Sequence, residues 1–335
     1  MRTPVVLDVD TGVDDACALL LAALHPDLDL RAVTCVGGNA PLADVVANTL
    51  TVLDACGRED VPVAAGAARP LLEVPVDARH VHGDDGMGDL DWPRSARVPE
   101  ERHAVALLRE VLTAAATSGD LVTLVALAPM TNLALLLRTY PEAARGVRRL
   151  VFMGGAAHVG NATASAEFNV FHDPEAAAVT LDACAELGVE VVMYGLDVFY
   201  EPRVTRAQAD ALVAASAHGP DGPAGLAGRL VAFQCERSGT ESATIGDAGA
   251  VCAVIRPAGL TTERLPVRVE LSGTWSRGRT IVDRRDWDGD LAHDPHGQAP
   301  SLLDVALGVD AEGYASLWLD TVSASATRPA SADPL

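Results

Sequence analysis

Four aspartates follow the first apolar run of the chain and form its densest group of chemically competent side chains. They are Asp8, Asp10, Asp14 and Asp15, in the sequence VVLDVDTGVDDA. Carboxylates this close together repel one another unless a cation lies among them. A hard, oxygen-binding ion would relieve that repulsion. The spacing therefore predicts a metal site, although Asp14 or Asp15 alone could be an ordinary helix cap.

The elements around these aspartates place them at one edge of a predicted sheet. Residues 5–7 suit a buried strand, and residues 18–21 suit the helix that follows it. A second strand over 28–34 ends just before Asn39, so this amide is expected at the same edge. Ligands bind outside the carboxyl ends of strands in open α/β sheets. We expect an α/β fold with a single-domain, Rossmann-like open sheet, mostly parallel, and helices on both faces.

Two further polar groups occur later in the chain. The predicted strand 150–153 leads into a segment of small residues that carries Asn161, Glu167 and Asn169, whose amide and carboxylate groups suit vicinal hydroxyls. Asp247 stands at the start of an apolar helical run, where it could be an ordinary cap. Both groups are therefore candidates for the same site as the aspartates.

The stretch from 66 to 99 is rich in proline, glycine and charge, and it contains His82. Long loops of this kind are usually functional or mobile. A lid over the site and a merely mobile loop both fit the sequence. Elsewhere periodicity predicts helices over 100–117, 205–215, 248–255, 302–309 and 314–322, and strands over 121–126, 189–194, 267–271 and 280–282.

The length and hydrophobic content allow one large domain. The chain has 335 residues, of which 49% are hydrophobic, and no long linker or internal repeat divides it. We expect one α/β domain over residues 1–322 and a disordered tail over 323–335. The net charge of −21 argues against nucleic-acid and anionic-membrane partners.

The cysteines and the apolar runs bear on the compartment. Six cysteines are scattered over apolar segments without a C-x-x-C pair, which suits reduced core thiols. The N-terminus shows no charged-then-apolar leader, and no apolar run is long enough for a membrane span. We expect a cytoplasmic protein.

Several ordered motifs resemble those of the calcium-dependent, inosine-uridine preferring nucleoside hydrolases. VLDVDTGVDDA resembles their DxDxGxDDA signature, and Val36–Asn39 resembles their V-x-G-N. Ala128–Asn132 is similar to their G-P-L-T-N turn, and Met153–Ala177 follows their MGG…GNAT…AEFN…DPEAA segment. The resemblance covers most of the chain.

This resemblance implies hydrolysis of the N-glycosidic bond of a ribonucleoside to ribose and free base, with a calcium-bound water as nucleophile. A carboxylate and amide environment would stabilise the oxocarbenium-like transition state. It also implies a homodimer or homotetramer. The implied calcium ligands are Asp10, Asp15, Asp247 and the carbonyl of Leu127, with Asp10 also the general base. The implied substrate contacts are Asp14, Asn39, Asn161, Glu167 and Asn169, and we add His82 from the long loop.

The chain departs from the family pattern at one position. Many members have a histidine directly before the late metal aspartate, but this chain has Gly246 there. A departing base needs a proton or dispersal of its charge. Candidate proton donors are His82, Arg237 and Glu241, and candidate stacking partners are Trp275 and Phe233. We expect departure of the base to be the weak step.

Two alternatives remain open from the sequence. A calcium-dependent nucleoside- or ribose-binding protein without turnover would fit the glycine at position 246. A haloacid-dehalogenase-like phosphatase would use Asp8-Val9-Asp10-Thr11 as its nucleophile motif. That scheme needs a downstream lysine, and the chain contains none, so we disfavour it.

Overall fold

The structure is a computed structural model that describes residues 2–216, 222–285 and 299–326. Among these residues, nine strands form one sheet in the order β10-β9-β11-β6-β5-β4-β1-β2-β3, and β7 pairs with β8 apart from it. The strands are β1 Thr3–Val9, β2 Leu28–Cys35, β3 Val63–Ala65, β4 Val122–Ala126, β5 Val147–Met153, β6 Glu190–Tyr194, β7 Arg203–Thr205, β8 Ser242–Thr244, β9 Leu260–Val269, β10 Thr280–Val282 and β11 Ser301–Val309.

Most neighbouring strands of the large sheet run parallel. β1 lies between β2 and β4 and is parallel to both, and the parallel pairing continues through β5 and β6 to β11. Only β9 reverses direction, since it pairs antiparallel with β11 and with β10. The predicted fold class, a mostly parallel α/β sheet, is confirmed.

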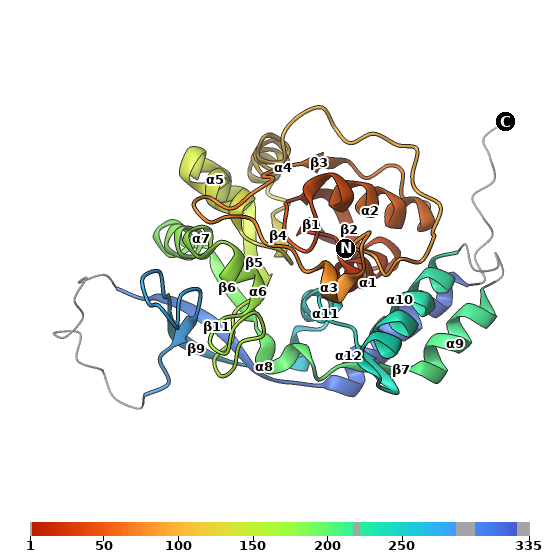
Figure 1. The fold of residues 1–335 in the computed structure, drawn as a ribbon. Coiled ribbons are helices and arrows are strands. Elements are labelled where there is room, and N and C mark those ends of the chain that lie inside the picture. The colour runs from red at the N-terminus through yellow and green to blue at the C-terminus, as the bar shows by residue number, and fades with distance from the viewer. Residues whose placement is uncertain (1, 217–221, 286–298, 327–335) are drawn as a thin grey trace.

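Helices cover both faces of the sheet, as predicted (Figure 1). The longer ones are α1 Val13–Leu24, α2 Leu42–Ala55, α4 Ala104–Ser118, α5 Thr131–Thr139, α7 Pro174–Leu187, α9 Arg206–Ala215, α10 Pro223–Ser238, α11 Ala248–Ile255 and α12 Ala311–Ser325. The shorter ones are α3 Arg79–His82, α6 Phe168–His172, α8 Leu196–Phe199 and the 3-10 turns η1 Pro141–Gly146 and η3 Pro257–Gly259.

The alternation of side chains along β1 divides the core into two layers. Val5, Leu7 and Val9 pack in the cluster that contains α1, α2, α10, α11 and α12. Val6 points to the opposite cluster, formed with α4, α5 and α7. A strand buried on both faces reads as a continuous apolar run, which is why the start of the chain signals its strand so clearly.

The predicted helix over 302–309 is wrong, because this segment is strand β11. Leu303 and Val305 are buried while Leu302 is 52% exposed. The backbone pairs with β6 on one side and with β9 on the other. A short apolar run fits a helix or a strand equally well by local pattern, and the partners on both sides decide.

The last helix runs three residues past the expected domain boundary at 322, because α12 ends at Ser325. Residues 327–335 of the expected tail lie outside the described residues.

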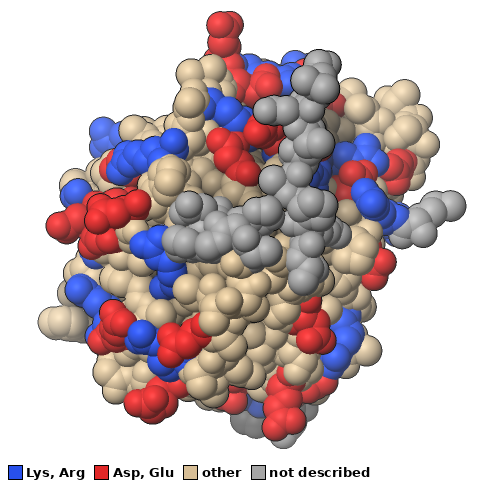
Figure 2. All heavy atoms as spheres, turned by 90° about the vertical axis from the view of Figure 1, so that its right-hand side faces the viewer, with Lys and Arg blue, Asp and Glu red and all other residues tan. Residues whose placement is uncertain are grey.

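Of the six cysteines, all free, only Cys56 is not fully buried. Within the described ranges, no helix combines the length and apolar character needed to cross a membrane. On the face drawn in Figure 2, arginines lie interspersed with aspartates and glutamates.

Candidate active site

Four buried or half-buried aspartates meet at the carboxyl edge of the sheet. Asp10 follows β1, Asp14 and Asp15 lie in the first turn of α1, and Asp247 immediately precedes α11. Side-chain oxygens of Asp14, Asp15 and Asp247 all lie within 4.8 Å of one another. The backbone N–H of Asp10 donates to Asp15 Oδ1 at 3.2 Å. Asp14, expected as a sugar contact, thus lies within the carboxylate cluster itself.

In the protein alone, the negative charges of these aspartates are not offset by a cation. Burial, followed by repulsion from neighbouring aspartates, raises the pKa of Asp10 and of Asp247 well above the ordinary range. The same causes raise the pKa of Asp15 to about 7. Buried oxygens of Asp10 and Asp14 have no hydrogen-bond partner among the described residues. Buried carboxylates without compensation are costly, so the cluster fits a bound cation.

Asn39 holds two members of the cluster in place. Its backbone N–H donates to Asp10 Oδ2 at 2.8 Å, and its Nδ2 donates to Asp15 Oδ2 at 3.1 Å. Gly38 must lack a side chain, because a Cβ there would lie 2.1 Å from Asp10 Oδ2. The motif after the second strand is therefore explained by close approach of the backbone to a carboxylate.

A cavity of about 700 Å³ opens above the aspartates. It is lined by eight of the ten residues that the sequence proposed for the site. They are Asp14, Asn39, His82, Leu127, Asn161, Glu167, Asn169 and Asp247. The other two, Asp10 and Asp15, are fully buried and belong to the network beneath it.

Glu167 uses both carboxylate oxygens to accept hydrogen bonds from the backbone of α6 and of the loop after β5. Oε1 accepts from the N–H of Asn169 at 2.7 Å, and Oε2 accepts from Gly155 at 2.8 Å and Val170 at 3.1 Å. Burial raises its pKa to about 7 although these bonds oppose the shift. Asn169 in turn donates through Nδ2 to the carbonyl of Leu127 at 2.9 Å. The carbonyl oxygen of Leu127 has a second lone pair, which remains available for another contact.

The aromatic side chains at the cavity differ from those proposed from the sequence. Trp275 is 89% exposed, and neither it nor Phe233 is among the lining residues. The rings that do line the cavity are Phe168, Phe171, Phe199 and Tyr200. Phe168 lies inside the AEFN motif and could have been found from its neighbours. Tyr200 follows the last recognisable motif, so no sequence signal marked it.

The three candidate proton donors lie at different positions relative to the cavity. Arg237 lines the cavity and donates to the carbonyl of His80, whereas Glu241 is not among the lining residues. His82 is 7% exposed, and its Nδ1 accepts from the N–H of Val13 at 3.1 Å. Burial lowers the pKa of His82. A neutral imidazole that accepts at Nδ1 carries its proton on Nε2.

Gly246 occupies a position that excludes a side chain in this backbone conformation. Its φ is +54°, and a Cβ would lie 2.5 Å from the Cβ of Asp14. Left-handed backbone of this kind favours glycine. The departure from the family pattern is therefore built into the turn between β8 and α11.

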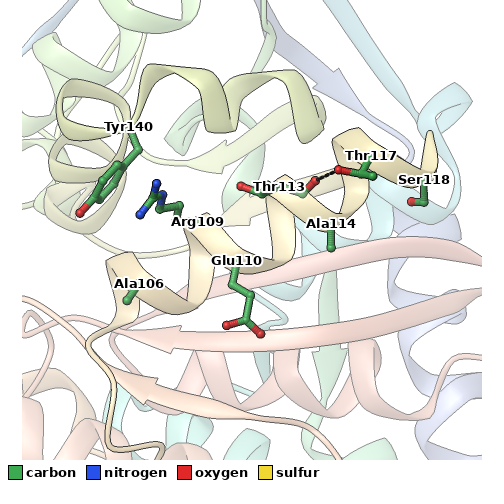
Figure 3. Close-up of a pocket in the computed structure, with 8 residues that line it drawn as sticks. All are labelled: Ala106, Arg109, Glu110, Thr113, Ala114, Thr117, Ser118 and Tyr140. Atoms are coloured by element: carbon green, nitrogen blue, oxygen red, sulfur yellow. Dashed lines mark hydrogen bonds between the residues drawn. The ribbon is translucent and has the colours of Figure 1, made fainter.

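A second hollow, of about 710 Å³, lies along the outer side of α4 and reaches Tyr140 (Figure 3). Arg109 stacks over the Tyr140 ring at 4.2 Å, and Glu110 and Thr113 come from the same helix. It contains no buried carboxylate cluster comparable with the one above β1. The chemistry therefore belongs to the cavity at the sheet edge.

Comparisons with known proteins agree with this site. A non-specific ribonucleoside hydrolase RihC of Klebsiella pneumoniae subsp. pneumoniae is 39% identical over 318 residues, which cover 94% of this chain and 96% of that protein. The structure of an inosine-guanosine nucleoside hydrolase superposes with a TM-score of 0.85 at 31% identity, covering 96% of this chain and 99% of that one.

A purine-preferring ribonucleoside hydrolase from Gardnerella vaginalis gives a TM-score of 0.84 at 27% identity, over 97% of this chain and 99% of that chain. The family described as inosine-uridine preferring nucleoside hydrolase matches residues 5–316, which include every aspartate of the cluster. The predicted family is thus confirmed by a match over nearly the whole chain. This protein belongs to the inosine-uridine preferring nucleoside hydrolase family.

Proposed function

We propose that this protein hydrolyses the N-glycosidic bond of ribonucleosides and releases ribose and a free base. The observation that carries this is the buried aspartate cluster at the floor of a cavity that also offers amide groups and aromatic rings. A sugar that develops positive charge in the transition state is stabilised by such carboxylates. The names of the relatives support a ribonucleoside as the substrate.

The cation of this site is proposed to be calcium, held by Asp10, Asp15, Asp247 and the carbonyl of Leu127. The donors are all oxygens, and Asp10 retains a buried oxygen without a partner among the described residues. All-oxygen ligation is typical of calcium. When bound, calcium supplies positive charge that offsets the carboxylates and attracts sugar hydroxyls and water. Asp14 is close enough to Asp15 and Asp247 to be a further ligand.

Different residues are proposed for proton transfer and for binding of the sugar. Asp10 is proposed as the general base, because its buried Oδ1 has no hydrogen-bond partner among the described residues and is free to accept a proton. Asn161 and Asn169 are proposed to bind ribose hydroxyls from the other side of the cavity. Glu167 supports them by holding the N–H of Asn169.

His82 is the best-supported hydrogen-bond donor to the leaving base, where it would disperse the negative charge that develops on departure. Its Nδ1 is occupied by the N–H of Val13, so Nε2 carries the proton, and the ring lines the cavity. This geometry supplies a donor even though Gly246 cannot. It therefore argues against our sequence-based expectation that departure of the base is the weak step.

Replacing His82 separates these two possibilities. We expect His82→Ala to lower kcat/KM for inosine or uridine by about 10²-fold or more, the usual effect of losing a preorganised hydrogen-bond donor to developing negative charge. Hydrolysis of p-nitrophenyl riboside, whose leaving group needs no protonation, should fall by less than about fivefold. Steady-state kinetics with both substrates measure this. An equal loss for both substrates would show that His82 does not assist departure of the base.

Replacing Asn169 tests the sugar contact. Asn169→Ala should weaken binding of every ribose-containing ligand by about 1–3 kcal/mol, whatever the base, because a buried polar contact is lost. Competitive inhibition by ribose analogues and KM values for several nucleosides measure the effect. A loss confined to one nucleobase would refute the assignment.

A substrate panel tests the proposed function. We expect ribose release from at least one of inosine, uridine, cytidine and adenosine, and no phosphate release from p-nitrophenyl phosphate. The phosphatase alternative has no support, because the chain belongs to a nucleoside hydrolase family. Nucleoside binding without ribose release would favour the non-catalytic alternative that Gly246 suggested.

The assembly and compartment are also proposals. We infer a homodimer or homotetramer in the cytoplasm. Large apolar side chains on the surface, such as Trp275 at 89% and Val74 at 77% exposure, offer area for contacts between copies. Light scattering coupled to size exclusion measures the mass in solution.

A further inference from the structure

Residues 66–78, called the strap below, lead from β3 to α3 (Figure 1). Its last residues, Val76, Asp77 and Ala78, line the cavity. Its middle is poorly buried, since Leu72 is 72% exposed and Val74 is 77% exposed. The exposed middle is therefore held by the ion pair between Glu73 and Arg277 and by backbone hydrogen bonds rather than by apolar packing.

The first anchor of the strap is Asn132, at the start of α5. Its Oδ1 accepts from the N–H of Ala67 at 2.9 Å. Its Nδ2 donates to Asp8 Oδ1 at 2.8 Å and to the carbonyl of Cys35 at 3.1 Å. The side chain is completely buried. One amide thus ties the beginning of the strap to the ends of β1 and β2.

The second anchor is Asp173, the cap of α7. Its Oδ2 accepts from the N–H of Leu71 at 2.9 Å and from Thr131 Oγ1 at 2.6 Å. Its Oδ1 accepts from Ala176 at 3.0 Å and caps the helix. The far end of the strap is held by the site itself, since Ala78 donates to the carbonyl of Asn39 at 3.0 Å.

We propose that Thr131, Asn132 and Asp173 are positioning residues that hold the strap in the position needed to enclose a nucleoside in the cavity. None of the three lines the cavity, so each acts through the strap. The Thr-Asn pair at the start of α5 thereby gains a role in substrate binding. The proposal rests on the proposed function for the identity of the substrate, but the anchoring itself does not.

Thr131→Val tests the anchoring without reference to activity. The substitution removes one of two donors to Asp173 Oδ2 and keeps the size of the side chain. We expect hydrogen exchange of peptides covering residues 66–78 to become about three- to tenfold faster, because Asp173 is no longer oriented by Thr131 and holds the N–H of Leu71 less firmly. Thr131→Ser should restore exchange to the wild-type rate.

The kinetic readout separates positioning from chemistry. For Thr131→Val we expect KM for nucleosides to rise by about three- to tenfold, with kcat within about twofold. Inhibition by free ribose should be unchanged, because the sugar is bound by the opposite wall. Thr180→Val is the matched control: Thr180 is also buried, and its hydroxyl has no hydrogen-bond partner among the described residues.

Unchanged exchange in the strap for Thr131→Val would overturn the proposal, as would a loss confined to kcat. Faster exchange in the Thr180→Val control would also overturn it, because the effect would then be general softening. If the wild-type protein releases no ribose, the proposed function fails while the exchange result still decides the anchoring.

Discussion

Asp10→Asn is expected to reduce hydrolysis of both inosine and p-nitrophenyl riboside by about 10²–10⁴-fold, the range for loss of a general base. Both substrates need a deprotonated water, and only the natural one needs its leaving group protonated. The loss should therefore be similar for the two substrates, unlike that for His82→Ala. Steady-state rates of base or p-nitrophenol release measure it.

Asp8→Asn provides the matched control for this experiment. Asp8 is a buried carboxylate two residues earlier, and its Oδ1 accepts hydrogen bonds from Thr34 at 2.6 Å and from Asn132 at 2.8 Å rather than from the groups around Asp15. We expect it to keep activity within about tenfold, since it makes no proposed contact with the reacting atoms. Retention of full activity by Asp10→Asn would remove Asp10 from the mechanism.

Removal of calcium should have the second large effect. We expect chelation to abolish measurable turnover and calcium to restore it. At a hundredfold excess over Kd, calcium should stabilise the fold by about 2.7 kcal/mol, which corresponds to a rise of roughly 4 °C in the unfolding midpoint. Asp247→Ala should lose this response, whereas Asp304→Ala, at a half-buried position of β11 that pairs with Arg264, should retain it. Differential scanning fluorimetry measures both.

The same carboxylates give calcium binding a pH dependence with a defined sign. Burial and repulsion raise the pKa of Asp15 to about 7 and that of Asp10 well above its ordinary range. Below these values the metal-free cluster binds protons, which calcium must displace. The calcium Kd should therefore be larger at pH 6 than at pH 8. A Kd independent of pH over this interval would contradict the assignment of these carboxylates as ligands.

Local pattern and one topological rule were enough to find the core of the site. The apolar run before Asp8 predicts a buried strand, and the rule that ligands bind at the carboxyl ends of parallel strands places Asn39 beside Asp10. The structure agrees, since Asn39 donates to Asp10 and Asp15. These features are predictable because each depends on residues close in sequence to a strand end.

Features that depend on distant partners could not be predicted in the same way. Residues 302–309 look helical by pattern and become β11 because β6 and β9 flank them. The contact between His82 and Val13 joins residues 69 positions apart. In each case a long-range contact, invisible in the local sequence, decides the role.

The most direct measurement of the central claim is product analysis with inosine in phosphate-free buffer containing calcium. We expect ribose and hypoxanthine in equal amounts from the wild-type protein, and neither from Asp10→Asn. Equal amounts without phosphate identify water as the acceptor of the ribosyl group. Absence of both products for every nucleoside tested, or their appearance only after phosphate is added, would contradict the hydrolytic role proposed for the aspartate cluster.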